Sequence, residues 1–149
     1  MVMISKYLDE KFIKFFSAKE RDEVIEILVE ELNSAGVLLD KQAFYQAILD
    51  REKVVSTGIG MGVAIPHAKL SSYDDFFISI GILKEGVNWN ALDGSPVRIV
   101  FLIGGPDDKQ TQYLQILSNL TLAIKDEERR RRMLDLTEVK DIIRLFEEL

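Results

Sequence analysis

Apolar side chains recur at three- and four-residue spacing in two stretches of the first third of the chain, which predicts two amphipathic helices. The first helix is predicted to begin at Ser17, whose hydroxyl can cap it while the Glu20 carboxylate reaches back, and to end at Gly36. The second is predicted to begin after Asp40, a favourable N-cap residue, and to run toward Arg51.

The last third of the chain has the same helical periodicity. A long helix is predicted first, another helix begins near Asp126, and a last helix ends the chain. The residues expected to face inward are Leu114, Leu117, Leu120 and Ile124 in the long helix, and Val139, Ile142, Ile143 and Phe146 in the last one.

Two short, continuous apolar runs between these helices are rich in β-branched and aromatic residues, as buried strands are. They cover residues 76–83 and 97–103, and Gly104-Gly105-Pro106 closes the second. No linker, repeat or low-complexity stretch interrupts the sequence. We therefore expect one domain over residues 1–149, with an α/β sandwich fold in which helices flank a mixed β-sheet.

Charge and composition exclude several classes of function. A net charge of −6 argues against a nucleic-acid-binding protein, which needs a basic face. The chain has no cysteine, which excludes a disulfide framework and a cysteine nucleophile and fits a cytoplasmic protein. The N-terminus lacks the features of a signal peptide, and no apolar run approaches the ~20 residues that span a bilayer, so no membrane insertion is expected.

One basic run, residues 129–132, consists of four arginines and follows the acidic residues 126–128 on a predicted helix. We interpret it as a solvated helix face. The alternative is a docking edge for an acidic partner.

The stretch from Ser56 to Leu70 carries the candidate chemistry. Gly58, Gly60 and Gly62 remove side chains at alternate positions, and successive amides in such a loop can point at a phosphate. The pattern matches neither a P-loop nor the dinucleotide fingerprint. The glycines by themselves fit a tight turn or bulge beside a strand equally well.

His67 follows Pro66, which stiffens the approach to it, and is the only histidine of the chain. A neutral imidazole is a good nucleophile near pH 7, and its second nitrogen can donate a hydrogen bond that fixes the tautomer. A half-buried structural histidine is the alternative. A metal site is not expected, because one histidine without cysteine leaves only carboxylates as further ligands.

Arg51 is the third element of the candidate site. Its planar guanidinium can bind two oxygens of a phosphoryl group at once. In isolation, the residue is also explained as a cation that interacts favourably with the carboxyl end of a helix.

Taken together, these elements resemble a known family. The order Arg51-Glu52, then Ser56-Thr57-Gly58-Ile59-Gly60-x-Gly62-Val63-Ala64-Ile65-Pro66-His67, resembles the phosphorylation motif of enzyme IIA of the fructose/mannitol class. These proteins belong to the bacterial phosphoenolpyruvate-dependent phosphotransferase system. The similarity continues through Lys69-Leu70, residues 90–103 and Leu114-x-x-Leu117-Ser118.

The resemblance implies a phosphoryl carrier. His67 would accept a phosphoryl group from the phosphohistidine of a small phosphocarrier protein (HPr-like) and pass it to an enzyme IIB, usually at a cysteine in sugar transport. Arg51 would hold the phosphoryl group, and the loop with Ser56, Thr57, Gly58, Gly60 and Gly62 would bind phosphate. No cofactor is implied. The family fold is a mixed sheet between helices.

One position departs from the family pattern. Many relatives have a second histidine near the start of the long helix, where this chain has Tyr113. The tyrosine hydroxyl can donate to a phosphoryl oxygen and is a possible substitute, but it carries no positive charge. The departure allows a slower or partner-shifted carrier, a subgroup without the second histidine, or a domain kept for regulation.

The alternative function is a regulatory module similar to the nitrogen-related branch of the family, whose binding to target proteins depends on phosphorylation of His67. The segment Ile65-Pro66-His67-x-Lys69-Leu70 favours this branch slightly. In either role two proteins dock in turn, so we expect an apolar rim around His67 with Ile59, Met61 and either Phe76 or Phe77. The sequence leaves open whether Asp93 or Glu52 orients the imidazole.

Overall fold

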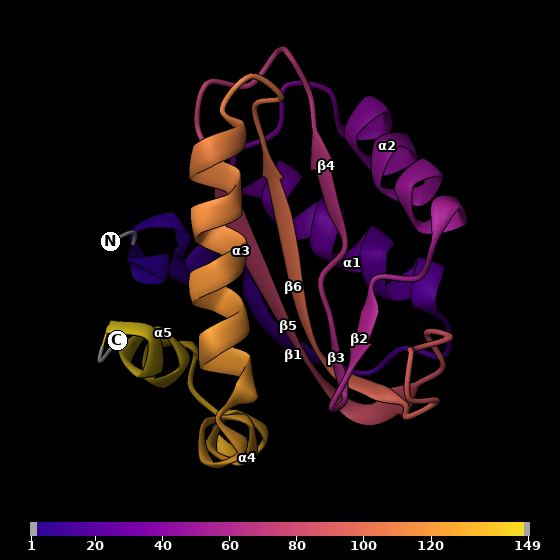
Figure 1. The fold of residues 1–149 in the computed structure, drawn as a ribbon, viewed down its shortest axis with the longest axis vertical. Helices are drawn as coiled ribbons and strands as arrows, with labels where there is room; N and C mark the ends of the chain where they lie inside the picture. The colour runs from indigo at the N-terminus through magenta and orange to yellow at the C-terminus, as the bar shows by residue number, and fades with distance from the viewer. Residues whose placement is uncertain (1–2, 148–149) are drawn as a thin grey trace.

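The computed structural model describes residues 3–147 and has a six-stranded mixed sheet between two layers of helices (Figure 1). The expected α/β sandwich is therefore confirmed. In chain order the elements are 3₁₀ helices η1 (Ile4–Tyr7) and η2 (Glu10–Phe12), then β1 (Ile13–Phe16), α1 (Arg21–Ser34), α2 (Lys41–Val54), β2 (Gly58–Gly60), β3 (Val63–Ala64), β4 (His67–Lys69), β5 (Phe77–Val87), β6 (Val97–Gly105), α3 (Gln110–Lys125), α4 (Glu127–Asp135) and α5 (Val139–Glu147).

Strand β6 holds the sheet together. The strand order is β1-β5-β6-β3-β2. Strand β4 pairs with the same edge of β6 as β3 does, but nearer the carboxyl end of β6. The β5–β6 and β2–β3 pairs are antiparallel, whereas β1 runs parallel to β5, and β3 and β4 run parallel to β6. Both predicted strands are present. They extend further than predicted, since β5 continues to Val87 and β6 includes Gly104 and Gly105.

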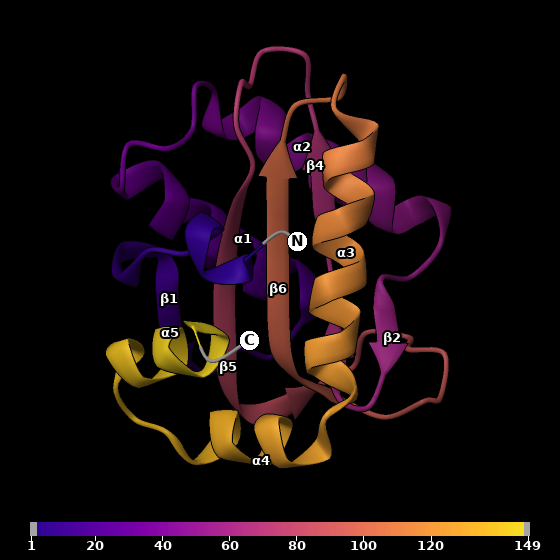
Figure 2. The same cartoon turned by 60° about the vertical axis from the view of Figure 1, so that its left-hand side comes forward.

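Alternate residues of β6 face two separate apolar layers, as the two-residue period of a strand requires. Ile99, Phe101 and Ile103 pack under α3 and α5, and Val100 and Leu102 pack under α1 and α2. Figures 1 and 2 show α3 along one face of the sheet and α1 and α2 on the opposite face. Among the described residues, no helix is long and apolar enough to cross a membrane.

Helix α1 corrects one expectation and confirms another. It begins at Arg21 and not at Ser17, and its N-cap Glu20 makes no side-chain capping bond. The predicted capping box is therefore wrong, because residues 17–20 do not join the helix. Its end is as predicted. Gly36 has φ of +77°, and the bonds from Gly36 N–H to the Asn33 carbonyl and from Val37 N–H to the Leu32 carbonyl close a Schellman motif.

Helix α2 is capped as predicted, since the Asp40 carboxylate accepts a hydrogen bond from the Ala43 amide at 3.1 Å. It runs to Val54, which places Arg51 inside the last turn. Helix α4 is likewise capped by Asp126, whose carboxylate accepts from the Arg129 amide. The predicted Asp40 cap is confirmed, and so is the predicted start of a helix near Asp126.

The inward face of α3 differs from the predicted one. Leu114 is 53% exposed, and Leu117 is only partly buried. The buried residues are Tyr113, Ile116, Leu120, Ala123 and Ile124. The prediction for Leu114 is wrong because the helix is rotated so that Tyr113 and Ile116, and not Leu114, face the sheet.

The arginine run is only partly a solvated face. Arg131 is exposed and pairs with Glu128, as expected of such a face. Arg129 and Arg130 instead turn back and donate to the carbonyls of Ala123 and Ile124 at the end of α3. Both carbonyls belong to the last turn of α3, where carbonyls lack partners within the helix; that of Ala123 also accepts from the Asp126 amide.

Candidate functional site

A cleft of about 450 Å³ lies between the end of α2, the β2–β3 hairpin, the start of β4 and helix α3. Its lining residues are Arg51, Ser56, Thr57, Ile59, Met61, Ile65, His67, Tyr113, Leu117, Thr121 and Lys125. The fold thus brings five predicted site residues, Arg51, Ser56, Thr57, His67 and Tyr113, to one cleft. Sequence analysis did not identify Thr121 and Lys125 as site residues.

His67 is the first residue of β4 and is half-buried. Its Nδ1 lies 3.0 Å from the carbonyl oxygen of Ile65. Because a carbonyl only accepts, Nδ1 carries the hydrogen and donates it. In the neutral ring the lone pair is then on Nε2, which is the ring nitrogen with the chemistry of a nucleophile. Neither Asp93 nor Glu52 makes this bond, so the orienting group is the Ile65 carbonyl.

The surroundings of His67 favour the neutral imidazole. Burial lowers the pKa of His67 below 6.5, and the positive charges of Arg51 and Lys69 lower it further. The hydrogen bond to Ile65 and the charge of Glu52 act in the opposite direction without cancelling this shift. A nucleophilic lone pair is therefore available throughout the neutral pH range.

Tyr113 lies beside the imidazole, in the first turn of α3. Its ring centroid is 5.8 Å from that of His67 and 6.0 Å from that of Phe76, and the Lys69 ammonium lies 4.1 Å from its centre. Burial raises the pKa of Tyr113 to about 12. The phenol therefore keeps its proton and can donate a hydrogen bond, and its hydroxyl makes none within residues 3–147.

Arg51 reaches the cleft from the last turn of α2. Its Nη1 donates to the Val55 carbonyl at 2.9 Å, which holds the guanidinium against the segment that leaves the helix. Its charge adds to the lowering that burial causes in the pKa of His67 and opposes, without cancelling, the rise that burial causes in the pKa of Tyr113. The remaining N–H groups of the guanidinium are free to bind an anion.

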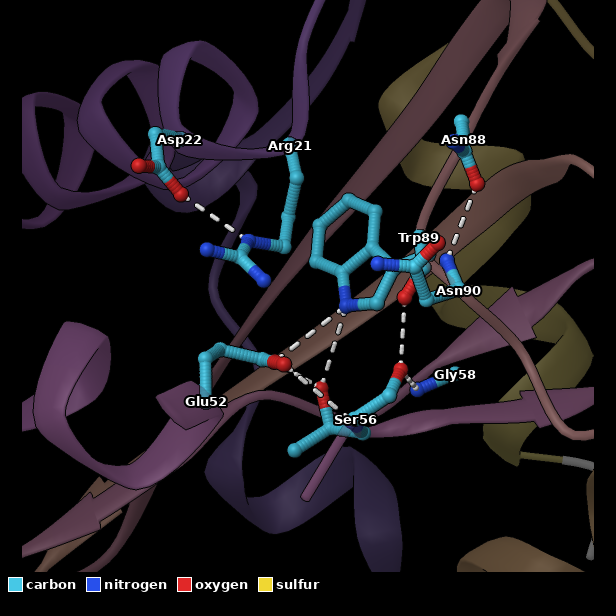
Figure 3. Close-up of polar contacts among 9 residues, drawn as sticks. Arg21, Asp22, Glu52, Ser56, Gly58, Asn88, Trp89 and Asn90 are labelled. Atoms are coloured by element: carbon cyan, nitrogen blue, oxygen red, sulfur yellow. Dashed lines mark hydrogen bonds and ion pairs between the residues drawn. The ribbon is translucent and has the colours of Figure 1, made fainter. Parts of the chain in front are cut away.

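Figure 3 shows a buried hydrogen-bond network around Glu52, the residue that follows Arg51. The carboxylate of Glu52, which is 4% exposed, accepts hydrogen bonds from the Thr57 amide, the Thr57 hydroxyl and the Trp89 indole N–H. The Ser56 hydroxyl donates to the Trp89 carbonyl at 2.6 Å and accepts from the Gly58 amide. Ser56 and Thr57 therefore line the cleft with hydroxyl groups that already hold the loop in place.

The three glycines build the hairpin. Gly60 and Gly62 have φ of +97° and +75°, and Met61 between them also has a positive φ of 61°. The Asp93 carboxylate accepts hydrogen bonds from the Ser95 hydroxyl and from the Met61 amide. These hydrogen bonds, first of all that of the Ser95 hydroxyl, lower the pKa of Asp93 to about 2. The glycines therefore form a tight turn beside a strand, one of the two interpretations of this loop. Phosphate binding by the amides of Gly58, Gly60 and Gly62 stays a prediction.

The apolar rim is partly as expected. Ile59 and Met61 line the cleft, and Met61 is 41% exposed. Phe76 and Phe77 are both buried, at 4% and 7% exposure, so their predicted place on the rim is wrong. Both belong to the apolar core, and Leu117 of α3 lines the cleft instead. Within residues 3–147, no group of three or more histidine, aspartate or glutamate side chains is placed to hold a metal ion.

Comparison with known proteins agrees with the resemblance. Residues 6–149 match the family model described as "Phosphoenolpyruvate-dependent sugar phosphotransferase system, EIIA 2". The chain is 41% identical over 133 residues to the fructose-specific EIIABC component of Bacillus subtilis, which covers 89% of this chain but only 21% of that protein. It is 35% identical over 109 residues to the nitrogen regulatory protein of Escherichia coli, which covers 71% of this chain and 66% of that protein.

The fold is also known from solved structures. The crystal structure of nitrogen regulatory protein IIA-Ntr from Neisseria meningitidis superposes with a TM-score of 0.90 and covers 97% of this chain and 99% of that one. The sequence identity is 23%, so this similarity concerns the fold alone.

Replacement of Glu52 tests the buried network. Glu52→Gln turns one of the accepting oxygens into a donor, so we expect the free energy of unfolding to fall by about 1–3 kcal/mol. Urea denaturation measures this, and the emission of Trp89, the only tryptophan, reports on the network itself. The control is Glu26→Gln on the exposed surface of α1, with an expected change within about 0.5 kcal/mol. Equal stability of Glu52→Gln and wild type would contradict the role given to the carboxylate.

A pH titration tests the environment of His67. Because the folded-state pKa is lowered, the unfolded chain binds the proton more tightly, and folding loses stability as the pH falls below 6.5 and through the folded-state value. The ring C–H resonances of this single histidine should titrate with a midpoint below 6.5. His67→Gln should lose less stability than wild type between neutral and mildly acidic pH. A midpoint at or above 6.5 would refute the buried, neutral imidazole.

Proposed function

Because the chain belongs to the EIIA 2 family of the phosphoenolpyruvate-dependent sugar phosphotransferase system, we propose that it carries a phosphoryl group on His67. The group comes from the phosphohistidine of a phosphocarrier protein and passes to an enzyme IIB. The Bacillus subtilis relative, named an EIIABC component, supports this order of transfer. The exchange takes place in the cytoplasm, which the absence of cysteine fits.

The observation that carries the proposal is the hydrogen bond from His67 Nδ1 to the Ile65 carbonyl, at 3.0 Å. It leaves the lone pair of Nε2 to attack phosphorus. In the first transfer the Nε2–P bond forms while the N–P bond of the donor breaks, and the donor nitrogen keeps the electron pair. In the second transfer the Nε2–P bond breaks as a bond to the acceptor, a thiolate in an enzyme IIB, forms. The ring keeps its Nδ1–H throughout, so both transfers use the same orientation of the imidazole.

Arg51 and Tyr113 bind the phosphoryl oxygens in this proposal. The guanidinium supplies positive charge and free N–H groups, and the phenol supplies an uncharged O–H donor. Since phosphoryl transfer needs mainly positioning and electrostatic stabilisation, these groups and an oriented imidazole are sufficient.

A regulatory role is the second candidate. The segment Ile65-Pro66-His67-x-Lys69-Leu70 favours it, as does the similarity to the nitrogen regulatory protein of Escherichia coli. Phosphorylation would then change which proteins bind around the cleft. A phosphorylated chain that transfers its phosphoryl group to no enzyme IIB of its organism would favour this candidate.

Phosphorylation of the purified protein tests the proposal. With phosphoenolpyruvate, enzyme I and the phosphocarrier of the same organism, the intact mass should increase by one phosphoryl group that is labile in acid and stable in base. His67→Ala should remain unmodified, and Arg51→Lys should react more slowly because the ammonium cannot bind two oxygens at once. Active partners that leave a folded wild-type protein unmodified would refute the carrier role.

Tyr113→Phe tests the phenol without removing the ring that packs on His67 and Phe76. A hydrogen bond to a charged group contributes about 1.5–3 kcal/mol, so we expect the rate of phosphoryl transfer to fall by about tenfold or more. Quenched-flow measurement with the phosphorylated phosphocarrier gives this rate. Tyr113→His, which restores the pattern of many relatives, is the comparison. If Tyr113→Phe reacted as fast as wild type, the hydroxyl would have no part in transfer.

A further inference from the structure

Met61 is a methionine whose side chain the fold holds on the rim of the cleft. It lies at the tip of the β2–β3 hairpin, with a positive φ of 61°, and is 41% exposed. Its amide donates to the Asp93 carboxylate at 3.0 Å. The carbonyl of the next residue, Gly62, accepts from the amides of Arg98 and Ile99 in β6. These bonds anchor the hairpin on both sides of its tip, so the backbone keeps the thioether at the surface.

The other methionines that the structure describes differ from Met61 in exposure or in position. Met133 of α4 is 2% exposed and belongs to the apolar core. Met3 is 49% exposed, but it precedes η1 and does not line the cleft. An oxidant has to reach the sulfur of a thioether, so oxidation of methionine follows exposure. Within residues 3–147, Met61 is therefore the methionine at which an oxidant both reaches the sulfur and changes the cleft.

An N–H donor already lies beside the Met61 sulfur. Arg130 Nη1 is 3.5 Å from it, and the same nitrogen donates to the Ile124 carbonyl at the end of α3. A thioether sulfur is only a weak acceptor, whereas a sulfoxide is strongly polar and its oxygen accepts hydrogen bonds readily. A sulfoxide at this position would meet the guanidinium on one side and water on the other. The fold can therefore accommodate the oxidised side chain without leaving a polar group unpartnered.

The rim that Met61 occupies is apolar. Ile59 and Leu117 line the same cleft. A protein–protein interface covers about 800 Å² on each partner, which is far larger than the mouth of a cleft of about 450 Å³. Under the proposed function, any protein that exchanges a phosphoryl group with His67 therefore contacts this rim. A sulfoxide would replace one apolar contact there with a hydrated group that the partner has to desolvate.

We propose that Met61 is a site of oxidation by hydrogen peroxide, and that its sulfoxide weakens the docking of proteins at the cleft. The second part of this inference rests on the proposed function. The sulfur lone pair attacks one peroxide oxygen, and the S–O bond forms as the O–O bond breaks. The proton of the attacked oxygen passes to the hydroxide that leaves, which gives water. Sulfur is oxidised by two electrons and the peroxide is reduced. A methionine sulfoxide reductase reverses the change at the expense of two thiols, which become a disulfide as water is released.

Treatment with hydrogen peroxide tests both parts of the proposal. The proteins are wild type, Met61→Leu and, as the matched control, Met3→Leu, which removes an exposed methionine outside the cleft. After the peroxide has been removed, digestion and mass spectrometry give the oxidised fraction at each methionine. The second-order rate constant of His67 phosphorylation is then measured with two donors, the phosphorylated phosphocarrier of the same organism and phosphoramidate.

The ratio of these two rate constants isolates docking from chemistry. Phosphoramidate is too small to contact the rim as a protein does, so it reports on the reactivity of His67 alone. Each protein is compared with its own untreated sample, which cancels any effect of the substitution itself. Urea denaturation of the treated samples shows whether the fold is retained.

We expect oxidation at Met61 but not at Met133, with an unchanged midpoint of urea denaturation. The ratio should fall about three- to tenfold in wild type and in Met3→Leu, because the docked partner meets a polar group in place of an apolar one. It should stay constant in Met61→Leu, and treatment of the oxidised wild type with the reductase should restore it.

Oxidation of Met61 as slow as that of the buried Met133 would overturn the modification site. A wild-type ratio that survives complete oxidation of Met61, or an equal fall in Met61→Leu, would overturn the effect on docking. An untreated wild-type protein that neither donor phosphorylates would instead contradict the proposed function, and with it the docking part of the inference.

Discussion

The site depends on where the backbone groups of Ile65 point. Strands β3 and β4 pair with β6 in one continuous register, and Pro66 between them still accepts a hydrogen bond from Ile103 through its carbonyl. Ile65, one residue earlier, therefore faces away from β6. Its N–H bonds to the Thr57 carbonyl, at the last point where the β2 segment runs beside it. Its carbonyl has no strand beyond it, and the His67 ring supplies the hydrogen that a buried carbonyl needs. This one hydrogen bond thus gives the Ile65 carbonyl a partner and fixes the tautomer of His67.

This arrangement links the segment before β2 to the last turn of α2. The pairing of the β2 segment with the chain at Ile65 starts at Thr57, which leaves the Ile65 carbonyl free. The buried Glu52 carboxylate fixes Thr57 by accepting from its amide and its hydroxyl. Glu52 belongs to the same turn of α2 as Arg51, whose guanidinium is held by the Val55 carbonyl, so the loop and the guanidinium are anchored at the same helix end. Under the proposed function, the phosphoryl-binding groups and the nucleophile consequently belong to one network, and a change in its buried part affects both.

Much of the fold could be predicted because it follows from long apolar patterns. Strands β5 and β6 are continuous apolar runs, and Asp40, Gly36 and Asp126 have local capping chemistry that determines helix ends. Strands β2, β3 and β4 have only two or three residues each, too few for a period to be recognised. The capping box at Ser17 was wrong because a capping motif describes local preference, and the chain at residues 17–20 does not join the helix.

The candidate site shows a similar division. His67, Arg51 and Tyr113 could be identified from residue chemistry and from the family motif. Lys125 and Thr121 could not, since neither residue belongs to that motif. A signal was nevertheless present, because Tyr113, Leu117, Thr121 and Lys125 follow at four-residue spacing on a helix with no other charge. The prediction instead took Leu114, and not Tyr113, as the first inward-facing residue of α3.

The tyrosine at position 113 changes how the site handles charge. A second imidazole could carry positive charge toward the phosphoryl group, whereas a phenol with a pKa of about 12 contributes only a neutral donor. Under the proposed function, the positive charge closest to the phosphoryl group must then come from Arg51. The Lys69 ammonium lies against the Tyr113 ring and donates to Gln110, so it fixes the tyrosine while adding to the positive potential at His67. That potential favours both the neutral imidazole before transfer and the dianionic phosphoryl group after it. A site with one histidine can therefore serve both states without a second titrating ring.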